Sequence, residues 1–153
     1  MTELDDQDRE ILRIIQKDAR ISSEAIGEMV NLSAASVHRR LRRWREEGVI
    51  EREAAILNAK ALGAPMTILV SVVMEREHVD VMNAFANRMR VHPNVQQCYM
   101  ITGEADFLLI VKVRDMEDFE QFCEEAFHDR QSFRKFNSSI VMSTVKAGLS
   151  APV

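Results

Sequence analysis

The chain has 153 residues, a net charge of −4 and an apolar fraction of 46%, which suits one ordinary domain or two small ones. No uninterrupted apolar stretch approaches the roughly 20 residues that a membrane-spanning helix requires, so we expect a soluble protein without a membrane partner. The acidic residues 1–8 do not resemble a secretory signal and indicate a cytoplasmic protein. Cys98 and Cys123 are too few for a disulfide framework and lack metal-ligand spacing, so we interpret them as reduced core thiols and expect no metal or cofactor.

Two short helices are predicted over the first 31 residues. The first covers residues 5–20, where Asp5 or Asp6 can cap the helix and Asp8 occupies the carboxylate position of a capping box. The second begins after Ser22 and ends at Asn31, a residue type that tolerates the left-handed conformation. Both carry apolar residues at helical spacing along one side only, which is typical of amphipathic helices packed on a small core.

A third helix is predicted from the N-cap Ser33 to about Glu47, with Gly48 as its left-handed stop. The tight turns between the three helices are typical of a helix-turn-helix unit. The third helix holds a quarter of all basic residues of the chain, as five arginines within seven positions: Arg39, Arg40, Arg42, Arg43 and Arg45.

A helical wheel separates this helix into two sides. Val37, Leu41 and Trp44 lie within one narrow arc and are predicted to pack inward. Small and basic residues lie opposite or beside that arc, as in a recognition helix that reads base edges with its first turns and holds phosphates further on. We therefore predict contacts with double-stranded DNA for Ser33, Ala35, Ser36, His38, Arg39, Arg40, Arg42 and Arg43.

A solvated charged face is the alternative interpretation of the arginines, and Glu46 and Glu47 favour it. The outward charges are nevertheless all positive until Glu46, and arginines without interleaved carboxylates repel one another unless a polyanion is present. Residues 1–63 carry 11 basic and 12 acidic side chains. Attraction to DNA must therefore come from local segregation, with the carboxylates of the first helix turned away from DNA.

The second half of the chain follows a different pattern. Residues 49–57 are predicted to be extended and residues 57–65 to be a linker, with Gly63 and Pro65 as breakers. Strands are then predicted over residues 67–74, 95–101, 107–113 and 138–146, and helices over 79–91 and 116–127. This order is typical of a ferredoxin-like βαββαβ sandwich. We expect an α+β protein with a DNA-binding domain and its linker in residues 1–63 and a second domain in 64–153.

Both faces of the predicted sheet are apolar. In the strand over residues 107–113, Leu108 and Ile110 point away from the side taken by Phe107 and Leu109, and the first strand shows the same two-sided character. Two amphipathic helices can cover only one face, and large exposed apolar patches usually mark interfaces. The sequence therefore predicts a dimer in which two sheets pack against each other.

The sequence resembles the Lrp/AsnC, or feast/famine, family of transcription factors along nearly its whole length. Leu4-Asp5 with Asp8 and Ile11-Leu12, Leu32-Ser33 with Val37 and Arg40, and Gly48-Val49-Ile50 resemble the family's winged helix-turn-helix signature. Residues 102–109, Thr-Gly-Glu-Ala-Asp-Phe-Leu-Leu, resemble its C-terminal hairpin motif. The resemblance implies dimers that assemble into octamers or similar discs, and a small effector, typically an amino acid, bound between dimers.

By family position, the effector pocket would be lined by Tyr99, Thr102, Gly103, Glu104, Ala105 and Asp106, with Ser138 and Ser139 at the start of the last strand. A glycine lets backbone amides approach a carboxylate, and Asp106 offers a partner for an α-ammonium group. The alternative is that Gly103 serves a tight turn and Asp106 caps it. Both roles are compatible.

Two rival functions have less support. An enzyme of the dimeric ferredoxin-like kind would use Asp106 or His92 as acid or base, but the sequence contains no nucleophile with an adjacent base and no metal constellation. We expect no enzymatic activity. A weakly specific architectural DNA-binding protein without an effector remains an alternative to a sequence-specific regulator, and the ratio of specific to non-specific affinity separates the two.

Overall fold

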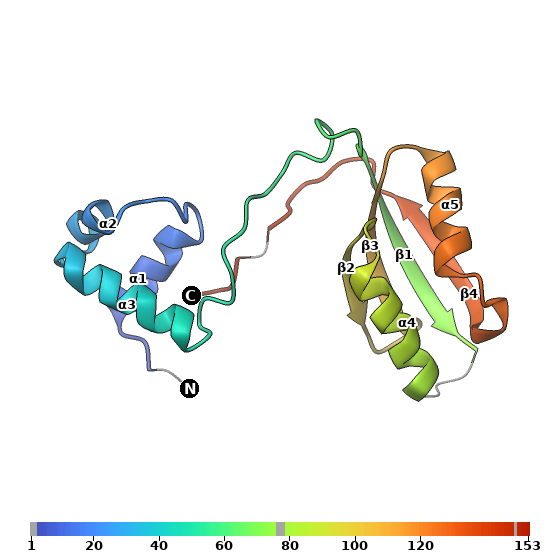
Figure 1. The fold of residues 1–153 in the computed structure, drawn as a ribbon, viewed down its shortest axis with the longest axis horizontal. Helices are drawn as coiled ribbons and strands as arrows, with labels where there is room; N and C mark the ends of the chain where they lie inside the picture. The colour runs from blue at the N-terminus through green and yellow to red at the C-terminus, as the bar shows by residue number, and fades with distance from the viewer. Residues whose placement is uncertain (1–2, 76–78, 149) are drawn as a thin grey trace. The chain divides into compact units, whose positions relative to one another are not determined.

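The computed structural model describes residues 3–75, 79–148 and 150–153. The chain divides into one unit formed by Met1–Ile56 and Lys146–Val153 and another formed by Leu57–Val145 (Figure 1). This division differs from the predicted border at residue 63, because the last eight residues group with the helix-turn-helix. There the Ala151 amide donates to the Gln16 side chain at 2.6 Å, and Arg13 Nε donates to the Val153 carbonyl at 2.9 Å.

The first unit contains three helices, α1 (Asp6–Ile15), α2 (Ser23–Val30) and α3 (Ala34–Glu46). The predicted N-caps Asp5, Ser22 and Ser33 each accept a backbone hydrogen bond, and Asp5 and Asp8 form the predicted capping box. Asn31 adopts the left-handed conformation that ends α2, with φ of 60°, and Gly48 follows α3 with φ of 74°.

Helix α1 is shorter than the predicted range 5–20. At its end, the Ile14 carbonyl accepts hydrogen bonds from the amides of both Lys17 and Asp18. The Asp18 carboxylate then accepts a hydrogen bond from the Arg20 amide at 2.8 Å. An aspartate that bonds to a backbone amide two residues later forms a local turn that competes with the helix. The helix therefore ends at Ile15 although the polar residues that follow would tolerate it.

The core of this unit is a cluster of seven buried apolar residues: Ile11, Leu12, Ile26, Val30, Val37, Leu41 and Trp44. The predicted inward arc of α3 is thus confirmed, and Trp44 is fully buried. Gly27 of α2 lies against the turn that leads into α3, where a Cβ atom would lie 2.5 Å from the Leu32 carbonyl oxygen. Residues 51–58 form neither helix nor strand, so the described residues after α3 contain no strand of a wing.

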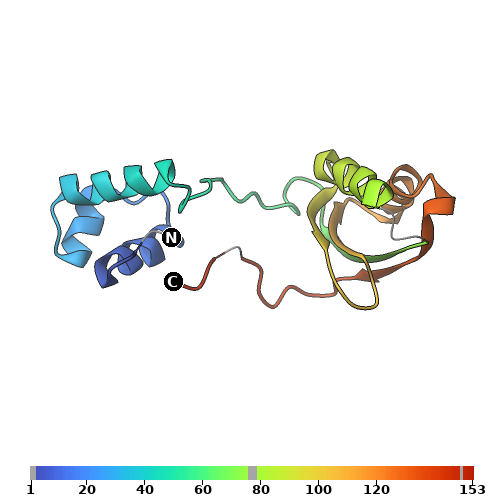
Figure 2. The same cartoon turned by 90° about the horizontal axis from the view of Figure 1, so that it is seen from below.

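The second unit is built on a four-stranded sheet. Its strands are β1 (Met66–Met74), β2 (Val95–Met100), β3 (Phe107–Val113) and β4 (Phe133–Ile140), in the order β2-β3-β1-β4 with every neighbouring pair antiparallel. The helices α4 (Val79–Val91) and α5 (Met116–Ala126) both lie on one face of the sheet (Figures 1 and 2). This arrangement confirms the predicted ferredoxin-like βαββαβ fold and the α+β class.

Alternating residues of β1 and β3 form the core of the second unit. Val70 pairs with Leu109 and Val72 pairs with Phe107, and all four side chains are buried beneath the helices. Phe85 from α4 lies edge-on to Phe107 at a centroid distance of 4.9 Å. The residues between them face the other way: Leu69 pairs with Ile110 and Ser71 with Leu108. Neither of the two helices of this unit, α4 and α5, covers this second face.

The last strand differs from its prediction. Strand β4 covers Phe133–Ile140 rather than residues 138–146, so Ser138 and Ser139 lie in its second half and not at its start. Arg134, Lys135 and Asn137 suit an edge strand whose side chains are exposed. Beyond the Val141 amide, which donates to the Thr67 carbonyl, β1 offers almost no further partner, and the strand ends. Within the described residues, no helix has the length and apolar character needed to cross a membrane.

Candidate nucleic-acid interface and ligand-binding region

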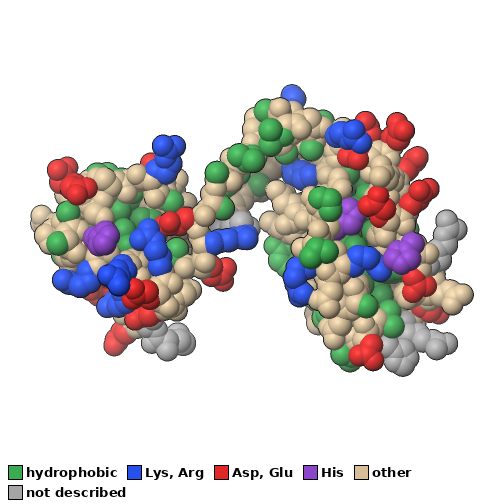
Figure 3. Space-filling model, viewed as in Figure 1, with side chains coloured by type: hydrophobic (Ala, Val, Ile, Leu, Met, Phe, Trp, Pro, Cys, Tyr) green, Lys and Arg blue, Asp and Glu red, His purple; other side chains and the backbone are tan. Residues whose placement is uncertain are grey.

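The outward side of α3 carries most of the predicted DNA-contacting residues. Ala35, His38, Arg39, Arg42 and Arg43 are exposed, and Ser36 is half-buried beside them. Ser33 is exposed too, but its hydroxyl already accepts the Ser36 amide at 3.2 Å as the N-cap. Figure 3 shows basic side chains gathered on this unit with acidic side chains among them.

Carboxylates lie closer to the arginines than the sequence suggested. Arg42 Nε is 2.8 Å from Glu46, and Arg45 Nη2 is 2.8 Å from Glu53. Arg43 lies at 3.9 Å from two carboxylates, those of Glu47 and Asp8. The premise that these arginines lack neighbouring carboxylates is therefore wrong.

These pairs leave the charges available for DNA. The Arg42–Glu46 pair is exposed, and exposed ion pairs contribute only about 0–1 kcal/mol, so a phosphate can replace the carboxylate at small cost. The hydrogen bond that Arg42 Nε donates to Glu46 raises the pKa of Arg42, which keeps the guanidinium charged. Among the described residues, Arg39 is the one arginine of the five with no ion pair within 4.0 Å.

Arg40 is placed differently from the other four arginines. Its side chain is 20% exposed, and its Nη1 donates to both carboxylate oxygens of Asp5, at 3.1 and 3.2 Å, and to Asp8. The Asp8 side chain is only 5% exposed. Partial burial acts to lower the pKa of Arg40, but the hydrogen bonds to Asp8 and Asp5 outweigh it and raise that pKa. Arg40 therefore interacts with α1 and not with the outward surface.

The predicted effector hairpin connects β2 to β3. The Ile101 amide donates to the Asp106 carbonyl at 2.9 Å, and Gly103 has φ of 121°, a conformation that favours glycine. Residues 102–104 are exposed and residues 105 and 106 are half-buried. Tyr99 is exposed on β2, where its hydroxyl donates to Gln97 Oε1 at 2.9 Å. The structure thus brings residues 99–106 together at one end of the sheet.

Asp106 anchors this hairpin to the neighbouring strand. Its carboxylate accepts the Met74 amide at 2.7 Å, and its own amide donates to the Val72 carbonyl at 2.9 Å. One carboxylate oxygen is therefore already used within the chain. A ligand ammonium group would have to share this carboxylate with the end of β1.

Ser138 and Ser139 do not join the hairpin within one chain. Both serines are on β4, where Ser138 pairs with Val70 of β1 and Ser139 pairs with Leu69 of β1. Strand β4 forms the opposite edge of the sheet from β2. Strands β1 and β3 separate them from Tyr99. Within one chain, the eight predicted effector residues therefore form two separate groups.

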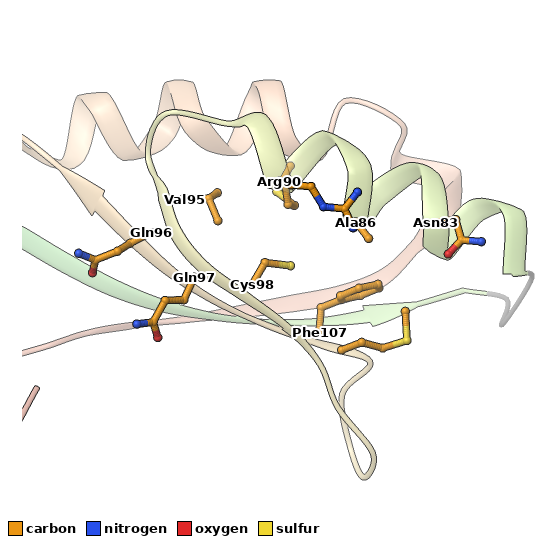
Figure 4. A pocket seen from close by; sticks show the side chains of 10 residues that line it. Asn83, Ala86, Arg90, Val95, Gln96, Gln97, Cys98 and Phe107 are labelled. Atoms are coloured by element: carbon orange, nitrogen blue, oxygen red, sulfur yellow. The ribbon is translucent and has the colours of Figure 1, made fainter. Parts of the chain in front are cut away.

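A pocket that the sequence did not predict lies between α4 and β2 (Figure 4). Its volume is about 400 Å³, and none of the predicted effector residues lines it. Asn83 and Arg90 come from α4, Gln97 and Cys98 from β2, and Phe107 forms part of the apolar floor. Burial raises the pKa of the Cys98 thiol, so this cysteine is no ready nucleophile. Asn83 and Arg90 are seven residues apart and so share a helix face, but no pattern in the sequence indicated that β2 lies opposite them.

Comparison with known proteins agrees with this architecture. The Lrp/AsnC ligand-binding domain model matches residues 67–150, and a winged helix-turn-helix DNA-binding model matches residues 4–51. An HTH-type transcriptional regulator of Sinorhizobium fredii is 39% identical over 151 residues, which are 99% of this chain and 89% of that protein.

Solved structures agree over the whole chain. An AsnC-family transcriptional regulator from Agrobacterium tumefaciens has a TM-score of 0.91 at 28% identity and covers 97% of each chain. A transcriptional regulator from Neisseria meningitidis, solved as an L-Met complex, also has a TM-score of 0.91, at 29% identity, over 98% of this chain and 97% of that one. With its helix-turn-helix and its βαββαβ unit both matched, this chain belongs to the Lrp/AsnC family of transcriptional regulators.

Proposed function

We propose that this chain is a sequence-specific DNA-binding transcriptional regulator whose action depends on a small effector, most simply an amino acid. The observation that carries the DNA-binding part is the outward side of α3, where small residues precede exposed arginines. Backbone phosphates attract the arginines, whereas the first turns can approach base edges. Such a regulator acts on chromosomal DNA, which places it in the cytoplasm.

Self-association is the second part of the proposal. Leu69, Leu108 and Ile110 lie on the sheet face that neither helix covers. Packing of two such faces would bury these residues and would present two recognition helices on one DNA duplex. Assembly of dimers into octamers or similar discs follows from the family resemblance and would give Ser138 or Ser139 of one copy a route to the hairpin of another.

Two places in the second unit, Leu57–Val145, are candidate binding sites for the effector; because the Lrp/AsnC ligand-binding domain model matches there, we call it the ligand-binding unit. The hairpin offers the exposed backbone around Gly103 beside the Asp106 carboxylate. The pocket between α4 and β2 offers Arg90 for a carboxylate and an apolar floor for a side chain. The L-Met complex of the Neisseria meningitidis regulator supports an amino acid as the ligand class but does not decide between the two places.

DNA binding is tested by titration of two duplexes, one selected by the wild-type protein from a randomised pool and one random duplex of equal length. Arg39→Ala should weaken binding of the selected duplex by roughly 10-fold or more. Arg114→Ala, which removes an exposed arginine of the other unit, is the matched control and should leave the affinity for the selected duplex unchanged. Equal affinity of Arg39→Ala and the wild type would refute the recognition-helix assignment.

Effector binding is tested by thermal shift against the twenty amino acids, because a ligand at 100 times its Kd stabilises the folded state by about 2.7 kcal/mol. The ligand that stabilises the wild type is then titrated against Gly103→Ala and Arg90→Met. If the ligand fails to stabilise Gly103→Ala alone, the binding site is assigned to the hairpin. If it fails to stabilise Arg90→Met alone, the binding site is assigned to the pocket. Stabilisation that survives in both variants places the ligand elsewhere.

The alternative of an architectural protein makes a different prediction for the same titrations. A weakly specific protein would bind the selected and random duplexes with similar affinity, whereas specific regulators discriminate by roughly 10³-fold or more. A ratio near one would therefore favour the architectural function.

A further inference from the structure

We infer that Arg40 together with Asp5 and Asp8 forms a bracket that fixes the recognition helix α3 against the start of α1. In this role Arg40 positions α3 and does not contact DNA phosphate. The inference rests on the proposed DNA-binding function, because it concerns how the same helix is oriented. It reassigns one of the arginines that the sequence placed on DNA.

The bracket is a closed set of polar contacts. The Asp8 amide donates to Asp5 Oδ1 at 2.6 Å, and the Asp5 amide donates back to Asp8 Oδ2 at 3.2 Å. Both carboxylates then accept from the same nitrogen, Arg40 Nη1. One guanidinium, 32 and 35 residues away in the sequence, therefore joins both members of the capping box of α1.

Burial decides that this pair persists when DNA is bound. Asp8 is the one buried charged residue recorded among the described residues, and Arg40 is its nearest cation. If Arg40 turned to a phosphate, Asp8 would keep only the Asp5 amide and a cation at 3.9 Å, and a buried carboxylate without its close ion-pair partner is strongly unfavourable. The exposed pair of Arg42 with Glu46 carries no such penalty and can exchange with phosphate.

The bracket can fix the orientation of α3 because its hydrogen bonds are directional. Leu41 and Trp44 pack α3 on the core, but apolar contacts are non-directional and tolerate small rotations of a helix. Charge-assisted hydrogen bonds depend on angle and so limit rotation about the axis of α3. That rotation determines whether Ala35 and Ser36 reach base edges. The bracket should therefore influence discrimination between sequences more than general attraction to DNA.

The first test compares Arg40→Met with Arg39→Met on the selected and random duplexes over a range of salt concentrations. A lost phosphate contact reduces the salt slope by about one, and this is expected for Arg39→Met. Arg40→Met should leave the slope unchanged but lower the ratio of specific to non-specific affinity by roughly 10-fold, about 1.4 kcal/mol. An equal reduction of the slope in both variants would show that Arg40 binds phosphate and would overturn the inference.

The second test uses Asp8→Asn, for which the two interpretations predict opposite signs. Removal of a negative charge beside the basic helix should tighten binding to both duplexes if only general electrostatics matters. If the bracket positions α3, the selected duplex should bind more weakly although the random duplex does not. Arg40→Lys keeps the charge but replaces the planar guanidinium, so it should recover only part of the discrimination. Tighter binding of both duplexes by Asp8→Asn would overturn the inference.

Folding and DNA binding are separated in the same series. Circular dichroism and thermal unfolding establish that each variant is folded at the titration temperature. If Arg40→Met does not fold, Asp8→Asn and Arg40→Lys are used to test the inference. If the wild type binds neither duplex, the proposed function fails. A double-mutant cycle with Asp8→Asn and Arg40→Met, measured by unfolding without DNA, still gives the interaction free energy of the pair. Zero coupling would overturn the bracket.

Discussion

The helix-turn-helix unit buries seven apolar residues around Trp44, whereas the ligand-binding unit buries fourteen, mainly along β1 and β3. All seven residues of the smaller core come from α1, α2 and α3, and Asp8, the one charged residue recorded as buried among the described residues, is held in an ion pair with Arg40. The larger core leaves one face of its sheet uncovered. Changes in the first unit should therefore alter folding, whereas changes on the open face of the second should alter association.

Trp44→Ala should have the largest effect. Truncation of a fully buried aromatic side chain costs about 3–5 kcal/mol, which approaches the total stability of a domain this small. The helix-turn-helix unit should unfold while the ligand-binding unit remains folded, as read by hydrogen exchange. The matched truncation Phe122→Ala, in the other core, should leave the amides of α1–α3 protected. Simultaneous loss of protection in both units would contradict their independence.

Leu108→Glu should break association without unfolding the chain. Leu108 lies at the centre of the open face, opposite Ser71 on β1 and Tyr99 on β2. A carboxylate buried between two sheets without a partner should weaken the dimer by roughly 100-fold or more. Sedimentation equilibrium measures this change, and Val91→Glu, at an exposed position of α4, is the control. An unchanged dimer would show that the open face is not the interface.

Gly27→Ala should reduce stability at the contact between α2 and the turn that leads into α3. The new Cβ atom would lie 2.5 Å from the Leu32 carbonyl oxygen, so the backbone must shift at a cost of about 1–3 kcal/mol. Denaturant unfolding measures this loss. Gly148→Ala introduces the same atom where nothing lies within 4 Å and should leave the midpoint almost unchanged. Equal midpoints for the two variants would mean that the turn at Leu32 can move away from Gly27 at no cost in stability.

Asp5→Asn should have the smallest effect, and the effect should depend on pH. Hydrogen bonds from the Asp8 amide and Arg40 hold the pKa of Asp5 below its ordinary value. The ionised side chain therefore stabilises the fold at neutral pH, and this contribution is lost as the pH falls through the lowered pKa. The difference in Tm between wild type and variant should shrink between pH 5 and 3. A constant difference over this range would exclude an electrostatic origin.

Local signals explain what could be predicted in the first unit. Ser33 and Gly48 are read from the sequence as cap and stop because each acts on its own backbone, and α3 begins and ends as they indicate. Arg40 could not be placed in the same way. Its partners Asp5 and Asp8 lie more than 30 residues away, and only the packing of α1 on α3 brings the three charges together.

Edges and long-range pairs explain what could not be predicted in the second unit. The central strands β1 and β3 are apolar on both faces, and their bounds are within one residue of the prediction. The edge strand β4 begins with Phe133 and continues through charged residues, which gave no strand signal. The role of Asp106 in anchoring the Met74 amide depends on a strand 32 residues earlier. The effector region was therefore predictable as a loop, but its internal contacts were not.

The grouping of Lys146–Val153 with the helix-turn-helix has a consequence for biosynthesis. The ribosome releases α1–α3 first, but the contacts of Ala151 and Val153 with this unit can form only after the whole ligand-binding unit has been translated. In topological terms the ligand-binding unit is an insertion within the DNA-binding unit. A nascent chain would therefore hold three helices that lack the contacts of residues 146–153 until that segment has been translated.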